Sequence, residues 1–150
     1  MGLVDISATP TNTTIIPTTP AFTGSLAFTS GTAFPILTAV VTGSDGRIYP
    51  IDPTTTIVGQ IPLMDGVALT EATAAGESIQ VAIVFGGVFQ TTGTNWAQGG
   101  LLYIAADGAL TQDYLSLSTT VRWIICVGRA VTPTSFIYEP HLPTNYVQDF

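Results

Sequence analysis

The sequence predicts an all-β fold, either a compact β-barrel or a β-sandwich, with extended N- and C-terminal arms. Helical periodicity is nearly absent, and short runs rich in Val, Ile, Thr, Phe and Tyr are separated by Gly, Pro and Asp. The length of 150 residues fits one domain with room for a hydrophobic core. We therefore expect an arm at 1–20, a β-domain at 21–140 and a C-terminal tail at 141–150.

The first element is the arm, whose stretch from Ala8 to Pro20 (ATPTNTTIIPTTP) carries no charge. Its three prolines fix φ and remove backbone donors, which excludes a helix or a central strand. Composition alone predicts disorder. A pre-extended segment loses little entropy on binding, however, so we expect the arm to lie along a neighbouring subunit. Its candidate interface residues are Pro10, Ile15, Ile16, Pro17 and Pro20.

The β-domain follows as a series of short strands. We predict them at Ala21–Thr29, Ala33–Thr42, Arg47–Ile51, Thr55–Ile61, Val67–Ala72, Ser78–Phe85, Val88–Thr92, Leu101–Ala105, Ala109–Thr111, Val121–Thr132 and Ser135–Tyr138. Asp-Gly pairs at 45–46, 65–66 and 107–108 predict turns, because Asp-Gly tolerates positive φ. The last pair predicts a hairpin between Tyr103 and Leu110.

Two predicted strands are apolar on both sides. Ser78–Phe85 and Val121–Val127 each place apolar residues on one face and only weakly polar ones on the other, so we expect both faces to be covered, by the core or by another subunit. The stretch Asp113–Thr120 fits a strand, a turn of helix or a loop.

Charge and composition argue against several classes of function. Charged residues make up 9% and hydrophobic residues 46% of the chain, which predicts a surface largely covered by other subunits. There is no lysine, and a net charge of −7 argues against binding nucleic acid through phosphates. No apolar run approaches the roughly 18 residues that span a bilayer, so we expect no membrane partner. The N-terminus also lacks the features of a secretory signal.

Catalytic and metal chemistry lack the residues they need. His141 is the only histidine and lies between Pro140 and Pro143 in a segment expected to be an extended tail, whereas a general base needs rigid positioning near its nucleophile. Cys126 is the only cysteine, and its apolar neighbours predict an inert buried thiol. The acidic residues are scattered without the spacing of a calcium loop. We therefore expect no enzyme activity, no metal and no cofactor.

The remaining candidate interface residues are Trp96, His141 and Tyr146. Trp96 lies in a polar, glycine-rich stretch, where it could stack on a sugar, anchor a subunit contact or plug the end of the barrel. Packing and subunit contact are the favoured alternatives. Trp123 is expected in the core.

The order of several short motifs resembles that of tailed-phage capsid decoration, or cement, proteins. The motifs are Gly66–Thr70, Ala74–Ile83, Gly86–Phe89, Trp96–Tyr103, Ala106–Thr111 and Val127–Thr132. The resemblance implies a non-enzymatic virion protein, made in the host cytoplasm, that binds the outer capsid surface and bridges capsomers. It further implies two partners, the major capsid protein and the chain itself as a homotrimer. Similar strings occur in phage tail-fibre β-domains, so a tail adaptor or a glycan-binding fibre component is the alternative.

Overall fold

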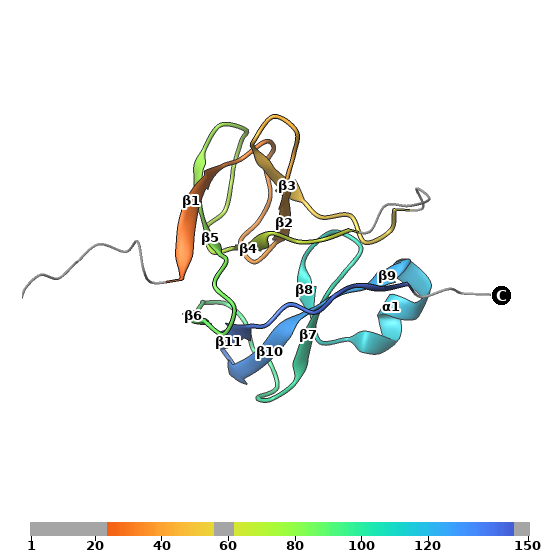
Figure 1. The fold of residues 1–150 in the computed structure, drawn as a ribbon. Helices are drawn as coiled ribbons and strands as arrows, with labels where there is room; N and C mark the ends of the chain where they lie inside the picture. The colour runs from red at the N-terminus through yellow and green to blue at the C-terminus, as the bar shows by residue number, and fades with distance from the viewer. Residues whose placement is uncertain (1–23, 56–61, 146–150) are drawn as a thin grey trace, which may run out of the picture.

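The computed structural model describes residues 24–55 and 62–145, and almost all of its regular structure is β-strand (Figure 1). Ten strands form two five-stranded antiparallel sheets, which confirms the predicted all-β class. The predicted arm at 1–20, the tail from Tyr146 onward and most of the predicted strand at 55–61 lie outside the described residues.

The first sheet has the strand order β1-β5-β4-β2-β3. Its strands are β1 (Ser25–Thr29), β5 (Ser78–Ala82), β4 (Gly66–Ala68), β2 (Ala39–Thr42) and β3 (Ile48–Pro50). Its two ends meet, because Ser30 forms a bridge with Ile48 and the N–H of Gly31 donates to the Ile48 carbonyl at 2.8 Å. The sheet therefore curls around one of its own faces.

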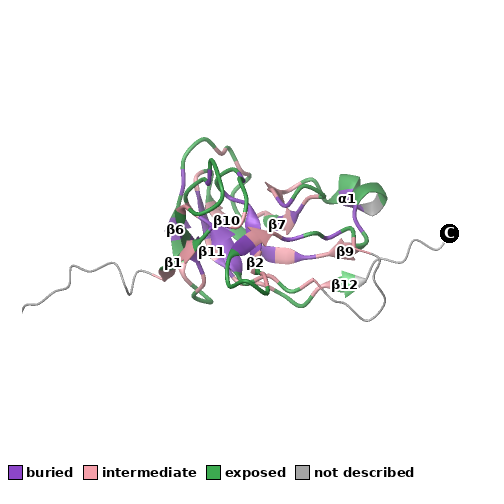
Figure 2. Cartoon of the chain, turned by 90° about the horizontal axis from the view of Figure 1, so that it is seen from above, coloured by how far each residue is buried: buried purple, intermediate pink, exposed green. Residues whose placement is uncertain are grey.

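The second sheet has the order β6-β11-β10-β7-β8. Its strands are β6 (Val88–Gln90), β11 (Ser135–Tyr138), β10 (Cys126–Thr132), β7 (Leu101–Ile104) and β8 (Leu110–Thr111). A two-stranded sheet pairs β9 (Trp123–Ile124) with β12 (Thr144–Asn145). This small sheet and the helix α1 (Tyr114–Thr120) lie at the end of the molecule opposite β1 and β6 (Figure 2).

Strand alternation in the first sheet produces two hydrophobic cores. Ala39, Val67 and Ala82 belong to a cluster that also contains Leu102, Ile104, Val127 and Phe136 of the second sheet. The intervening residues Val40, Ala68 and Val81 belong to a second cluster with Phe34, Ile48, Ala72 and Ile79, inside the curl. The central strands β2 and β4 are thus covered on both faces, and burying each such Val or Ile side chain contributes about 1.5–3 kcal/mol.

The predicted hairpin between Tyr103 and Leu110 is confirmed, since Ile104 of β7 pairs with Leu110 of β8. Gly108 in its turn has φ +90°, which only glycine adopts readily. The Gly108 carbonyl accepts a hydrogen bond from Ala39 N–H at 2.9 Å, so the hairpin ties the second sheet to β2.

The turn predicted at Asp65-Gly66 is wrong, because Gly66 begins β4. Glycine is needed there for close packing: a Cβ at Gly66 would lie 2.5 Å from the Ala82 carbonyl oxygen. Asp65 instead links strands, since its carboxylate accepts a hydrogen bond from Thr42 N–H at 2.7 Å.

Several predicted strands are shorter than expected, and two of them are interrupted. The strand predicted at Ala33–Thr42 is regular only from Ala39, because Leu37 adopts a positive φ of 67°. The strand predicted at Val121–Thr132 is split between β9 and β10.

Within the single chain, the second face of Ser78–Phe85 is buried at Ala82 and exposed at Gln80 and Val84, so cover of this face by another subunit stays a prediction. In Val121–Val127, Val121, Ile125 and Val127 are buried on one face, whereas Trp123 on the same face is only half-buried against the core in which it was expected. On the other face Arg122 is exposed, and Ile124 and Cys126 are half-buried.

The stretch for which a strand, a helix and a loop were all possible forms the helix α1. Asp113 caps it by accepting the Ser116 N–H at 3.3 Å. Leu117 is fully buried and fixes the helix to the domain.

Candidate functional site

Trp96 packs against the hydrophobic cluster shared by the two sheets rather than projecting into solvent. Its indole meets the ring of Phe136 edge-on, with centroids 5.9 Å apart and an interplanar angle of 87°. The backbone N–H of Trp96 donates to the Pro133 carbonyl at 3.1 Å. The backbone of the neighbouring Ala97 forms two hydrogen bonds with the Gln112 side chain. The glycine-rich loop is therefore held firmly, and Trp96 remains half-buried.

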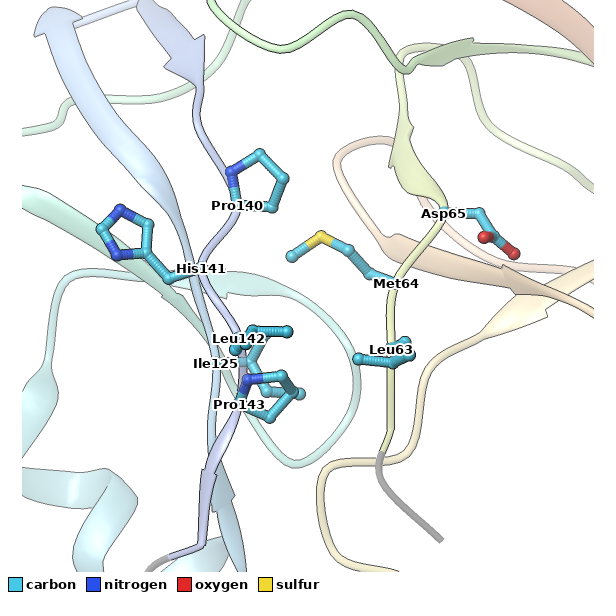
Figure 3. Close-up of a pocket in the computed structure, with 8 residues that line it drawn as sticks. All are labelled: Leu63, Met64, Asp65, Ile125, Pro140, His141, Leu142 and Pro143. Carbon is cyan, nitrogen blue, oxygen red and sulfur yellow. The ribbon is translucent and has the colours of Figure 1, made fainter.

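His141 lies on the segment between β11 and β12, where its backbone N–H donates to the Cys126 carbonyl at 3.0 Å. This segment forms one wall of a groove of about 340 Å³, and the residues leading into β4 form the other (Figure 3). The groove is lined by Leu63, Met64, Asp65, Ile125, Pro140, His141, Leu142 and Pro143. We call it the proline groove.

The polar groups of the proline groove do not converge. The imidazole of His141 and the carboxylate of Asp65 point away from the Met64 side chain, which extends toward Pro140 (Figure 3). Asp65 is engaged with the backbone of Thr42. The other residues that line the proline groove are apolar, so the groove suits an apolar contact better than acid–base chemistry.

Near the groove, Tyr138 on β11 is almost fully buried, with 3% of its surface exposed. Burial, assisted by the negative charge of Asp65, raises the pKa of Tyr138 to about 12. Its hydroxyl therefore stays neutral at physiological pH and serves packing.

A second apolar surface lies where the chain passes from the first sheet to the second. We call Val84–Val88 the junction loop; its large side chains are strongly exposed, with Phe85 at 67%, Val88 at 59% and Val84 at 48%. The loop is ordered by hydrogen bonds of Gly87 N–H to the Val84 carbonyl and of Gly86 N–H to the Tyr138 carbonyl. Exposed apolar side chains on a fixed turn are typical of a contact surface.

The opposite end of the molecule also exposes apolar side chains. Leu115 on α1 is 86% exposed, and Leu142, which lines the proline groove, is 83% exposed. Tyr114 is partly covered by an edge-on contact with Tyr103, at a centroid distance of 5.2 Å. Apolar contacts are thus available at both ends of the domain.

Within residues 24–55 and 62–145 no group of three or more His, Cys, Asp or Glu side chains is placed to hold a metal ion. No helix in the same ranges is long and apolar enough to cross a membrane. Burial raises the pKa of the Cys126 thiol, which is half-buried and lies 3.6 Å from the Gly128 carbonyl oxygen.

Of the candidate interface residues, the structure places Trp96 and His141, and it does not bring them into one site: Trp96 is not among the residues that line the proline groove. Pro10, Ile15, Ile16, Pro17, Pro20 and Tyr146 lie outside the described residues. Sequence reasoning missed Phe85, Val88 and Leu115. Gly86 and Gly87 allow the tight connection of the junction loop, but composition did not show that their apolar neighbours are exposed.

A family model described as phage cement protein matches residues 38–135, which is about two thirds of the chain. The matched stretch runs from the residue before β2 to the first residue of β11, so it includes most of both sheets and the junction loop. No curated protein matches the sequence.

Proposed function

The chain belongs to the phage cement protein family, and from this premise we propose that it binds the outer surface of a phage head and stabilises the contacts between capsomers. The family implies a structural role in the capsid. One observation supports binding to the head surface: the two sheets share a buried core, while apolar side chains on ordered loops are strongly exposed.

The physical basis is the burial of apolar surface between proteins. Two flat protein surfaces gain about 25 cal/mol for each Å² of apolar area removed from water, and aromatic anchors contribute most. The junction loop supplies one such anchor in Phe85, flanked by Val84 and Val88. We propose that this loop faces the major capsid protein.

The scarcity of charge fits this role. Only 9% of residues are charged, and in the part of the chain that the structure describes the ion pair between Arg129 Nε and Glu139 is long at 3.8 Å. A surface with few charges is poorly suited to a free monomer but loses little desolvation energy when other subunits cover it. We propose that the protein acts without catalysis and without a cofactor, as a homotrimer on the capsid.

Purified heads that lack this protein provide the test. Adding the purified chain should produce saturable binding, and it should raise the temperature at which the heads release their DNA. Heads that bind no protein, or that bind it and rupture at an unchanged temperature, would contradict the proposal. Labelled protein found on tails would instead support the tail component.

A further inference from the structure

The second sheet carries a row of side chains that crosses four of its strands. Ile137 of β11 is paired with Val88 of β6, the last residue of the junction loop, and with Arg129 of β10. Arg129 is paired in turn with Leu101 of β7. Directly paired residues point to the same face of a sheet, so these four side chains lie side by side on one face.

This row lies on the face that points away from the first sheet. Its neighbours along the strands, among them Phe89, Phe136 and Leu102, are buried in the core that the two sheets share. Because side chains alternate along a strand, the row lies on the opposite face of the second sheet, which is the lower of the two sheets in Figure 1. Val88 and Leu101 are accordingly exposed.

The row also holds a pair of opposite charges. Arg129 Nε lies 3.8 Å from Glu139 Oε1, and the two side chains are 49% and 33% exposed. This distance is too long for a hydrogen bond, so the pair leaves N–H donors of the guanidinium for another carboxylate. An exposed pair of this kind contributes little to stability. We call the four residues of the row, together with Glu139, the outer patch.

Charge complementarity favours a second copy of this chain as the partner of the outer patch. The chain has ten acidic and three basic residues and a net charge of −7, so two copies in general repel each other. In the outer patch the charges cancel, and another outer patch offers a carboxylate for Arg129 and a guanidinium for Glu139. A pair of copies satisfies both contacts reciprocally, and a closed ring of three satisfies them in turn.

We propose that the outer patch binds the outer patch of a second copy, with Arg129 of each chain bonded to Glu139 of the next. The side chains of Leu101 and Ile137 are buried between the copies. This inference rests on the self-association proposed above and names the surface that carries it. Apolar burial supplies the affinity, and the charge pairs fix the orientation of the two copies.

Charge reversal in the full-length chain tests this pairing. Arg129→Glu and Glu139→Arg should each weaken self-association on the order of tenfold or more, because like charges then face each other. A mixture of the two variants should regain binding between them, since a patch with two carboxylates then meets a patch with two guanidinium groups. Arg47→Glu and Glu71→Arg make the same charge changes at exposed positions outside the outer patch and are the matched controls. Sedimentation velocity of labelled chains measures the association.

A polar substitution tests the apolar part of the outer patch. Leu101→Thr removes apolar area but retains a residue suited to a strand, and it should weaken self-association on the order of tenfold. Leu26 on β1 of the first sheet is 46% exposed, close to the 47% of Leu101, so Leu26→Thr is the matched control. It should leave association unchanged.

The outcomes separate this inference from the proposed function. An unaltered chain that stays monomeric would contradict the proposed self-association and this inference together. If the unaltered chain associates, equal association of Arg129→Glu and Arg47→Glu, or a mixture of the two charge variants without regained binding, would overturn this inference alone. Loss of binding to heads with intact self-association in Arg129→Glu and Leu101→Thr would also overturn it and make the major capsid protein the partner of the outer patch.

Discussion

The Cα of Gly128 on β10 lies so close to Ile137 on β11 that a Cβ there would stand 1.9 Å from the Ile137 carbonyl oxygen. Gly128 has φ +151° and adjoins a register shift between β10 and β7. This contact joins two central strands of the second sheet. It also gives a steric reason for the glycine of the VGRAVT motif, which lies within the family match.

Replacing Gly128 should therefore be costly. We expect Gly128→Ala to lower the free energy of unfolding by about 3 kcal/mol or more, because backbone must shift on top of the strain of positive φ. Gly76→Ala is the matched control, since Gly76 has φ +92° with nothing within 4 Å of its Cβ position, and it should cost about 1 kcal/mol. Urea denaturation compares the two, and equal losses would show that the close approach is unimportant.

Trp96 should contribute to stability through Phe136. Trp96→Ala removes the edge-on ring contact and part of the core cover, and it should lower the free energy of unfolding by about 2 kcal/mol. Trp96→Phe retains an aromatic contact and should lose less than half as much. If Trp96→Ala left stability unchanged but weakened head binding, Trp96 would be a subunit anchor instead.

Stability should fall at high pH because of Tyr138. Its pKa is about 12 in the folded protein against about 10 when unfolded, so folding favours the neutral hydroxyl. The contribution is complete below pH 10 and is lost as pH rises through 12, with a loss of about 2 kcal/mol by pH 12. Tyr138→Phe should remove that part of the decline in denaturation series between pH 9 and 12. An equally steep decline in the variant would assign the effect to other groups.

The thiol of Cys126 should react slowly. Burial raises its pKa, so little thiolate is present at neutral pH. An aromatic disulfide reagent at pH 7.5 should modify the folded chain at least tenfold more slowly than the chain in urea. Equal rates would show that the site opens freely.

The junction loop should matter for binding more than for folding. Phe85→Ser should change the free energy of unfolding by no more than about 0.5 kcal/mol, because Phe85 is 67% exposed. It should nevertheless weaken binding to heads on the order of tenfold. Leu115→Ser at the opposite end is the control and should bind normally. An equal loss in both variants would argue against the junction loop as the capsid-facing surface.

Sequence alone predicted the fold class and the hairpin around Gly108, because β-branched runs and Asp-Gly turns are local signals. It could not predict that Leu37 interrupts a strand or that the ends of the first sheet meet at Ser30 and Ile48, since both depend on long-range packing. It left packing, subunit contact and sugar stacking open for Trp96, and the structure shows the contact with Phe136. It missed the exposure of Phe85, which an apolar residue in a sequence does not reveal.

The number of copies in each phage particle tests the central proposal most directly. A cement protein that covers the head surface should be present in hundreds of chains per particle, measured by quantitative mass spectrometry against the major capsid protein. A handful of chains per particle would contradict the proposed role on the head and assign the protein to the tail.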